Sequence, residues 1–230
     1  MDDYTIYYGL TFLAFVVTFG AQLYIKAVYS RYSKIPNQSG ITGARTASEI
    51  LYRNDLSSIN VLPTTGYLSD HYNPQNLSVS LSQDNYSSAS IAAMAVAAHE
   101  CGHALQDKES YAFLKVRTSL VPAANFSSFA GYLAIMLGIF IGMSELIWIG
   151  ILLEGVILLF QLVTLPVEFD ASSRALVKLQ EYGLAEGEDL AGAKKVLTAA
   201  ALTYVAGVAS SLLQILRLVL LYGRRDNRRR

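Results

Sequence analysis

The sequence predicts a mainly α-helical protein that crosses a membrane several times and also carries a small β-sheet. Hydrophobic residues make up 53% of its 230 residues and charged residues only 16%, and the mean hydropathy is +0.34. Such a chain is too apolar for an ordinary soluble domain. It contains four long apolar runs, and an H-E-x-x-H motif at His99–His103 lies in an Ala-rich stretch between the first two of them.

Charge and cysteine content exclude several classes of protein. The chain has 18 basic and 18 acidic residues, so it lacks the basic field expected of a protein that binds nucleic acid. Its clearest basic cluster is the tail RRDNRRR at residues 224–230, which suits anionic lipid headgroups. The single cysteine excludes an internal disulfide framework and a cysteine-rich metal cluster.

We expect residues 1–30 to form an N-terminal transmembrane anchor, because the stretch 4–29 is apolar and long enough to cross a bilayer. A cleaved signal peptide would begin with basic residues and have a shorter apolar core, so a retained anchor is the better interpretation. The positive-inside rule places the N-terminus outside and the following residues in the cytoplasm. The charges behind this orientation are Asp2 and Asp3 before the stretch, and Lys26, Arg31 and Lys34 after it.

Residues 31–118 are expected to form a cytoplasmic half-domain that opens with a helix and a sheet. Apolar residues recur at helical spacing over residues 43–54, with Thr42 as the N-cap. Residues 58–82 change to alternating apolar and polar residues with a turn at residues 73–76, which predicts a small antiparallel sheet. An edge strand of this sheet could pair with an extended peptide beside the helix that follows.

The next helix, expected within residues 87–107, carries the clearest chemistry. His99 and His103 lie on one helical face, so both imidazoles can bind one metal ion. Glu100 projects about 100° from His99, where it can act on water without becoming a ligand, and Cys101 at about 200° faces away. The apolar part of this helix is too short to cross a bilayer. The candidate N-caps are Asp84, Asn85, Ser87 and Ser88.

Residues 119–166 are predicted to form a transmembrane hairpin. Two apolar runs, 126–143 and 146–165, are separated by Ser144 and Glu145, and the outer turn has no Lys or Arg. Such a hairpin returns the chain to the side of the histidines. A cytoplasmic helix over residues 167–195 should follow it, started by Pro166.

The fourth hydrophobic helix, residues 196–223, is diluted by polar residues, and two rules disagree about its path. If it spans, the basic tail 224–230 ends outside, against the positive-inside bias. If the tail stays in the cytoplasm, the helix is interfacial, re-entrant or folded over the active site. The charge bias favours a cytoplasmic tail.

A catalytic zinc ion commonly takes three protein ligands, so a third one must come from elsewhere in the chain. Glu168 is favoured, because it lies on a narrow helical face with Ser172 and Ala175 that can approach the histidine helix. Asp170 lies about 200° from Glu168 and cannot bind the same ion from an undistorted helix. His71 is the remaining histidine. Three roles are open for it: a third metal ligand, a hydrogen-bond donor to the oxyanion that forms when a peptide carbonyl is attacked, or a hydrogen-bonded strand residue.

Four further residues have a functional and a structural interpretation. Tyr204 could donate to the same oxyanion or simply pack, and Asp70 could orient an imidazole or close a turn. Arg174 pairs with a carboxylate near the site or lies on the surface, and the surface interpretation is favoured. Glu154 lies within an apolar run, where a neutral, hydrogen-bonded acid is favoured over a functional one.

Taken together, the motifs resemble those of a known family. AVAAHECGHALQ, TLPVEFDASSRAL downstream, SDHYNP upstream and the hydrophobic hairpin between them resemble the YugP-like neutral zinc metallopeptidases of bacterial membranes, over nearly the whole chain. The layout is more distantly similar to the HtpX-type and CAAX-prenyl endopeptidases. The resemblance implies a zincin-like core with one zinc ion on His99, His103 and Glu168, and Glu100 as the base.

Two positions depart from these patterns. The HtpX-type pattern has an acid four residues after the ligand glutamate, where this chain has Ser172. The YugP-like motif reads DHYDP, where Asn73 replaces the second acid. The family patterns therefore do not identify the residue that contacts a metal-bound histidine in this chain. They also imply no charge-dependent role for position 73.

The sequence therefore predicts a gluzincin-like, zinc-dependent metalloendopeptidase of the bacterial plasma membrane, with its active site facing the cytoplasm. Its expected partners are a peptide or membrane-protein substrate, the lipid bilayer and other membrane proteins. The alternative is a non-catalytic zinc-binding scaffold or chaperone-like protein, which would need a fourth protein ligand such as His71. A metal transporter would need ligands within the spans, where Glu154 is the candidate.

Overall fold

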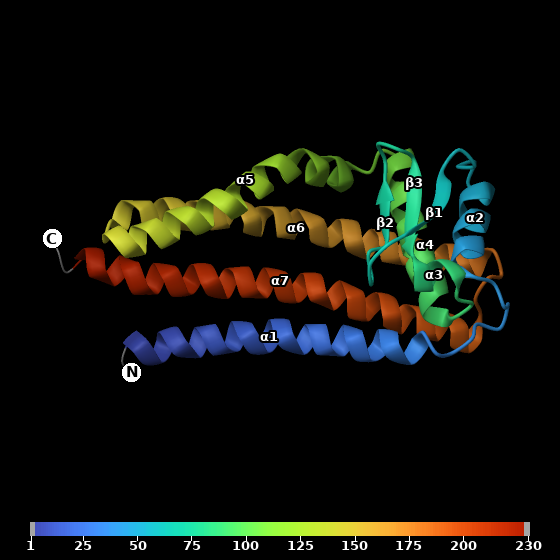
Figure 1. Ribbon diagram of the computed structural model, residues 1–230, viewed down its shortest axis with the longest axis horizontal. Coiled ribbons are helices and arrows are strands. Elements are labelled where there is room, and N and C mark those ends of the chain that lie inside the picture. Colours follow the sequence, from blue (N-terminus) through green and yellow to red (C-terminus); the bar gives the residue numbers. More distant parts are fainter. Residues whose placement is uncertain (1–2, 228–230) are drawn as a thin grey trace. The chain divides into compact units, whose positions relative to one another are not determined.

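A computed structural model describes residues 3–227, which are mainly helical, with one small sheet and connecting loops (Figure 1). The elements are α1 (Asp3–Tyr32), α2 (Gly43–Arg53), β1 (Asn60–Thr64), β2 (His71–Asn73), β3 (Ser78–Ser82), α3 (Gln83–Ser87), α4 (Ile91–Lys108), α5 (Ala112–Ile141), α6 (Ser144–Glu181) and α7 (Gly187–Asn227). A mainly helical protein with a small sheet is therefore confirmed. The last three residues of the basic tail, 228–230, lie outside the described residues.

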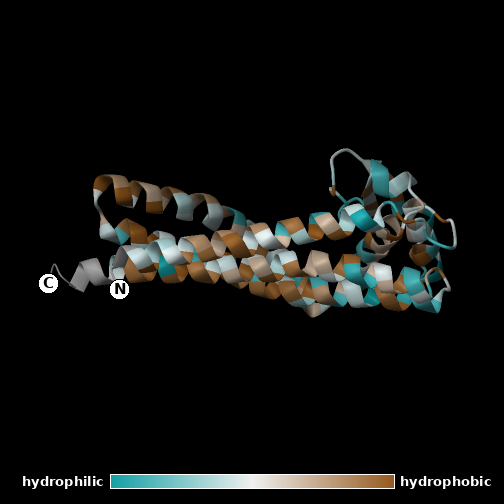
Figure 2. Cartoon of the chain, turned by 90° about the horizontal axis from the view of Figure 1, so that it is seen from below, coloured by the Kyte–Doolittle hydropathy of each residue, from teal (hydrophilic) through white to brown (hydrophobic). Residues whose placement is uncertain are grey.

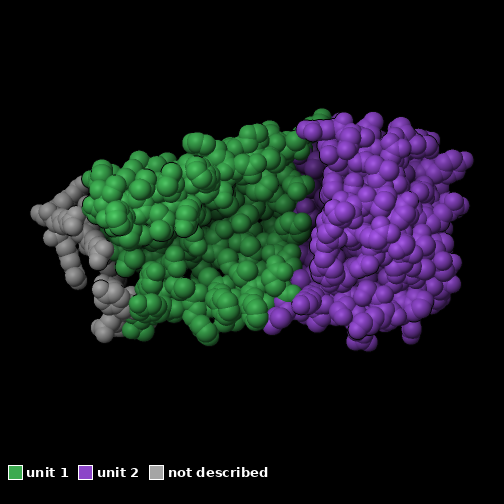
Figure 3. Space-filling view, viewed as in Figure 1, with its two compact units in different colours: residues 1–22, 115–165, 203–230 green, residues 23–114, 166–202 purple. Residues whose placement is uncertain are grey.

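The chain divides into two compact units, coloured separately in Figure 3. Unit 1 contains residues 1–22, 115–165 and 203–230, and unit 2 contains residues 23–114 and 166–202. The long helices α1, α5, α6 and α7 therefore contribute to both units.

Unit 1 has the surface of a membrane domain. Many of its large apolar side chains are exposed, among them Phe129 at 73% and Phe140 at 90%, and hydrophobic residues recur along its helices (Figure 2). Exposed apolar area of this extent is stable in lipid and not in water. Among the described residues, four helices are long and apolar enough to cross a bilayer: α1, α5, α6 and α7. The predicted multi-pass architecture is confirmed.

Helices α5 and α6 form the predicted hairpin, and glycines allow their close packing. A Cβ on Gly150 would lie 2.4 Å from Ile135 Cγ1, and one on Gly138 would lie 2.6 Å from Ile147 Cγ1. The turn falls at Gly142, whose φ of +81° favours glycine. It therefore comes just before the predicted pair, Ser144 and Glu145, which instead begin α6.

The fourth hydrophobic run is part of the continuous helix α7, which is long enough to cross a bilayer. It has no break of the kind that a re-entrant path requires. Within unit 1, α1 begins and α7 ends at the same end, where α5 also turns into α6 (Figure 1). An outside N-terminus combined with a cytoplasmic tail does not fit this arrangement, and the side of the membrane that this end faces stays a prediction.

The sheet in unit 2 has the strand order β1-β3-β2. β2 and β3 form the predicted antiparallel hairpin, whereas β1 pairs with β3 in parallel. The sheet is therefore mixed. The expectation of a wholly antiparallel sheet was wrong for β1, because residues 65–70 carry the chain across β3 before it enters β2. Alternation of residue types sets which side chains share a face but not which strands pair.

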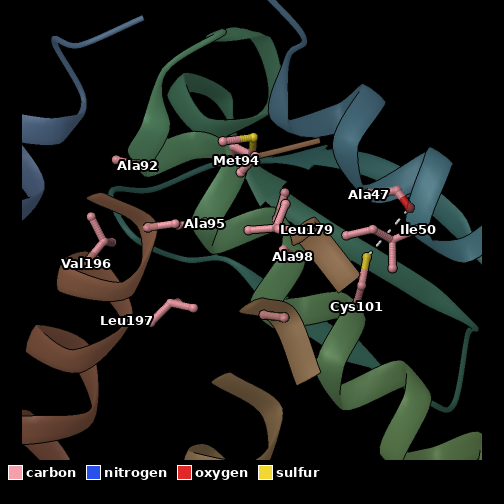
Figure 4. Close-up of a cluster of buried hydrophobic side chains, with 14 of the residues drawn as sticks. Ala47, Ile50, Ala92, Met94, Ala95, Ala98, Cys101, Leu179, Val196 and Leu197 are labelled. Carbon is pink, nitrogen blue, oxygen red and sulfur yellow. Dashed lines mark hydrogen bonds between the residues drawn. The ribbon is translucent and has the colours of Figure 1, made fainter. Parts of the chain in front are cut away.

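Helix α4 is the centre of the unit 2 core (Figure 4). Its alanines, including Ala95 and Ala98 at 0% exposure, pack beside Ile50 of α2, Leu179 of α6 and Val196 of α7. Small side chains allow several elements to approach one helix at once. The helix that carries both histidines is therefore held on several sides.

The start of α4 differs from the prediction. The helix begins at Ile91, and its N-cap is Ser90, whose side chain accepts a hydrogen bond from the Ala93 amide. Of the polar residues proposed as caps, 84, 85 and 87 instead belong to the short helix α3, and Ser88 is the C-cap of that helix. Several types of polar side chain share the preference for the N-cap, and several such residues lie close together before α4. The preference alone therefore does not select Ser90.

A second correction concerns Pro166, which lies inside α6 and does not start a helix. It is the first residue of unit 2 in this helix, directly after Leu165 of unit 1. Proline removes one backbone donor but is tolerated where the helical segments on both sides are stabilised by their own packing. The proposed boundary between residues 119–166 and 167–195 is thus not a break in the chain's structure, and the six-part division stays a prediction.

Candidate metal centre

Helix α4 presents the two histidines from one face. The ring centroids of His99 and His103 lie 4.8 Å apart with an interplanar angle of 82°. Their side chains are 15% and 11% exposed. Residues four apart on a helix lie one turn from each other, which accounts for this pairing.

Glu168 of α6 completes the cluster. Its Oε2 lies 3.3 Å from His99 Nε2 and 3.8 Å from His103 Nε2, and its side chain is 3% exposed. The close approach of the two helices has a local cause, because a Cβ on Gly102 of α4 would lie only 2.4 Å from the Ala171 backbone oxygen of α6. Glycine at position 102 therefore lets the two ligand-bearing helices touch.

The three donor groups suit a zinc ion in type and number. Among the described residues, His99, His103 and Glu168 form a group whose possible ligand atoms all lie within 4.8 Å of one another. Tetrahedral zinc with bonds of about 2.0–2.2 Å separates its ligand atoms by about 3.3–3.6 Å. Two imidazoles and one carboxylate are also the donors that a catalytic zinc site commonly uses.

Cys101 is not part of this group, as its helical position predicts. Its thiol donates a hydrogen bond to the Ala47 carbonyl oxygen at 3.6 Å, within the core (Figure 4). Burial raises the pKa of this thiol well above its usual range, so it stays protonated.

Glu100 lies next to the cluster and is 7% exposed. Burial raises the pKa of its carboxyl group to about 7; His99 lowers this pKa, and the Glu168 carboxylate raises it. The Tyr72 backbone amide of β2 donates a hydrogen bond to the Glu100 carboxylate. A carboxyl group with a pKa near neutrality can both accept and return a proton.

Each imidazole has a polar neighbour at its Nδ1 atom. Ser172 Oγ lies 3.1 Å from His99 Nδ1, and Gln106 Oε1 lies 3.0 Å from His103 Nδ1. Ser172 thus occupies the position where the HtpX-type pattern has an acid. Side chains of this kind orient metal-binding imidazoles.

His71 and Asp70, the other candidate residues near the sheet, contact neighbouring groups of unit 2. His71 lies on β2 and is exposed, with its Nδ1 2.9 Å from the Ser69 carbonyl oxygen. Asp70 accepts hydrogen bonds from Ser82 and Asn85, so it ties the start of β2 to the end of β3 and to α3. This matches the structural interpretation of Asp70. Any catalytic role of His71 stays a prediction.

Arg174 differs from the favoured prediction of a plain surface residue. Its side chain is 22% exposed and forms 2.6 Å contacts with both Asp170 and Glu109. The prediction of a plain surface arginine was wrong. Asp170 lies four residues before Arg174 on α6, and Glu109, the C-cap of α4, is brought beside α6 by the fold.

Tyr204 and Glu154 lie in unit 1. Tyr204 is 39% exposed on α7, and its proposed part in catalysis stays a prediction. Glu154 accepts a hydrogen bond from Gln214 at 3.4 Å and lines a pocket of about 400 Å³. Hydrogen bonding of this acid within the helical bundle agrees with its favoured interpretation.

Gln106 is the residue near the site that sequence reasoning missed. It is 0% exposed and lies three residues after His103, on the same face of α4. That spacing was the available signal. A lone glutamine has many structural uses, and its role becomes visible only once α6 lies beside α4.

Comparisons with known proteins identify the family of this chain. Residues 7–223 match the family model described as "Putative neutral zinc metallopeptidase". The chain is also 44% identical over 220 residues to "Putative membrane protease YugP" of Bacillus subtilis (strain 168), covering 95% of this chain and 98% of that protein. No solved structure matches. With two histidines and a glutamate gathered beside a buried carboxyl group, and with a match that spans nearly its whole length, this chain belongs to the neutral zinc metallopeptidase family.

Proposed function

We propose that this protein is a gluzincin-type metalloendopeptidase of the bacterial plasma membrane, which hydrolyses peptide bonds at the cytoplasmic surface. One observation carries the proposal: Glu168 of α6 lies within 3.8 Å of both histidine Nε2 atoms of α4, and Glu100 follows the first histidine directly. A three-ligand set leaves a fourth position for chemistry, whereas structural zinc normally has four protein ligands.

His99, His103 and Glu168 would hold the zinc ion. When bound, zinc polarises a peptide carbonyl and makes water acidic enough to lose a proton near neutral pH. Glu100 accepts that proton and returns it to the leaving amine, a role that its pKa of about 7 suits. The Tyr72 amide keeps the Glu100 carboxylate oriented by donating a hydrogen bond to it.

The substrate is proposed to be an extended peptide segment that lies along β2. This strand is at the edge of the sheet, and its Tyr72 amide already contacts Glu100, so the edge lies beside the reacting groups. Backbone pairing at a sheet edge holds a peptide irrespective of its side chains. His71 on the same strand is a proposed donor to the oxyanion.

The mechanism is tested with the purified full-length protein, Glu100→Gln and His99→Ala. Each is incubated with a complex peptide mixture, cleavage is read by mass spectrometry, and bound zinc is measured by elemental analysis. Glu100→Gln should keep one zinc ion per chain and lose cleavage, whereas His99→Ala should lose both. Cleavage by Glu100→Gln at the wild-type rate rejects the proposed base.

The cytoplasmic location rests on the basic residues that follow the first span, Lys26, Arg31 and Lys34. It is tested in intact cells with single cysteines in a Cys101→Ser background, at exposed Ser57 of unit 2 and at Met143 in the turn between α5 and α6. A membrane-impermeant maleimide should label the Met143→Cys protein and not the Ser57→Cys protein. The reverse pattern would place the site outside.

A further inference from the structure

We propose that Gln106 is a positioning residue, which fixes the orientation of His103 so that its Nε2 lone pair faces Glu168, and that Asp170 and Arg174 hold Gln106 in place. This inference rests on the proposed metal centre and assigns a second layer of residues to it. One continuous set of hydrogen bonds joins α4 to α6 through these residues.

The Gln106 amide has one consistent orientation. Two acceptors face one end of it, the Val167 carbonyl oxygen and the Asp170 carboxylate, each 2.8 Å from Nε2. Only the NH₂ group can donate to both. The carbonyl end, Oε1, must therefore be the atom 3.0 Å from His103 Nδ1.

This orientation determines which ring nitrogen of His103 carries a proton. An amide oxygen only accepts hydrogen bonds, so Nδ1 must donate and carries the proton. In the neutral ring, Nε2 then presents a lone pair toward the Glu168 Oε2 atom, 3.8 Å away. Two acceptors arranged in this way can both point their lone pairs at one cation, which is the arrangement of two ligands of a metal ion.

Burial makes the arrangement costly to break. Gln106 is 0% exposed, so losing any of its partners would leave a buried polar group without compensation. An amide also suits this place better than a carboxylate would, because the cluster already contains two buried acids, Glu100 and Glu168.

Asp170 and Arg174 extend the set outward. Arg174 Nε donates to the same Asp170 oxygen that accepts from Gln106, at 2.6 Å, and its other end pairs with Glu109 at 2.6 Å. The guanidinium group thereby balances the Asp170 carboxylate beside the centre. Since Glu109 is more than half exposed, the set runs from the protein surface to His103.

The two histidines are therefore held differently. A serine hydroxyl can donate or accept, so Ser172 does not by itself dictate which nitrogen of His99 is protonated. Gln106 can only accept at this contact. Replacing Gln106 should consequently weaken metal binding more than replacing Ser172 does.

The test measures zinc affinity of the full-length protein by competition with a fluorescent chelator, and the visible absorption spectrum of its cobalt(II) form. Gln106→Leu should lower zinc affinity roughly 10- to 100-fold and change the cobalt spectrum. Asp170→Ala should give a smaller loss. Asp170→Asn should retain near wild-type affinity, because one amide oxygen can still accept from both Gln106 and Arg174.

Asn37→Leu is the matched control. Asn37 is another buried amide of unit 2, and its hydrogen bonds go to Ser39, Ile41 and Ser90. Its replacement should lower thermal stability and leave zinc affinity unchanged. If Gln106→Leu and Asn37→Leu affect stability and zinc affinity alike, or if Gln106→Leu binds zinc as tightly as wild type, the positioning role is wrong. His103→Ala is run in parallel: loss of zinc there, without loss in Gln106→Leu, would reject this inference and leave the metal centre intact.

Discussion

Replacing Gly102 with alanine perturbs the contact that brings the two ligand-bearing helices together. The added Cβ would lie 2.4 Å from the Ala171 backbone oxygen, which belongs to α6 and cannot rotate away. The helices must separate by about 0.6–1.0 Å to bring this contact to between 3.0 and 3.4 Å. Zinc sites tolerate deviations of only about 0.2 Å in ligand distance, so Glu168 and the histidines would no longer fit one ion well.

The expected effect on stability is smaller than the effect on zinc. Overpacking costs about 1–3 kcal/mol, and alanine recovers about 1 kcal/mol through its higher helix propensity. The free energy of unfolding should therefore fall by at most about 2 kcal/mol, whereas zinc affinity should fall at least tenfold. Chelator competition measures the affinity, and thermal unfolding in detergent measures the stability.

Two other glycines provide matched controls. A Cβ on Gly43 would lie 2.2 Å from the Asn85 backbone oxygen of α3 and 3.0 Å from the Ala93 backbone oxygen near the start of α4, so Gly43→Ala should destabilise the protein and weaken zinc binding less than Gly102→Ala does. Gly155 has no atom within 4 Å of its added Cβ, and Gly155→Ala should change neither property. Wild-type zinc affinity in Gly102→Ala, combined with a clear loss of stability in Gly43→Ala, would refute the close helix contact at the metal centre.

Three further outcomes are expected. In zinc-free protein, Glu100 has its pKa raised from 4.5 to about 7, so the stability that its protonated form contributes is complete below about pH 4.5 and is lost as the pH rises through 7. The free energy of unfolding of Glu100→Gln should therefore exceed that of the wild type by about 3 kcal/mol at pH 8 and by little at pH 4. Thermal unfolding at the two pH values measures this difference. An equal difference in free energy at both pH values would contradict the raised pKa of Glu100. Cys101, buried and with a raised thiol pKa, should resist iodoacetamide in the folded protein and react after unfolding, which mass spectrometry detects; rapid alkylation of folded protein would disagree with its burial. Thr42→Ala should cost about 1 kcal/mol by removing the N-cap of α2, with zinc affinity unchanged in the chelator assay; no loss of stability would mean that the cap contributes nothing.

Local patterns predicted several features of the fold and site correctly. Thr42 caps α2 as expected, because both the cap and the helical spacing are read from neighbouring residues. The pairing of His99 and His103 on one face follows from helix geometry alone. Glu168 could be singled out because it lies on a narrow helical face with Ser172 and Ala175 and because the surrounding motif resembles that of a known family.

Features that depend on distant packing could not be predicted in the same way. The parallel pairing of β1 is decided by the path of a loop, and Pro166 continues a helix because long segments on both sides stabilise it. Gln106 acquires its partners on α6, and Arg174 its partner Glu109, only when α6 lies against α4. Their residue types carry no signal that distinguishes them from ordinary polar residues.

X-ray absorption at the zinc edge tests the central claim most directly, in wild type and in Glu168→Ala. Zinc on His99, His103 and Glu168 predicts one ion per wild-type chain, imidazole scattering from two histidines, only nitrogen and oxygen neighbours at about 2.0–2.2 Å, and loss of the ion in Glu168→Ala. A sulfur neighbour at about 2.3 Å, a third imidazole, or full zinc retention by Glu168→Ala would contradict it.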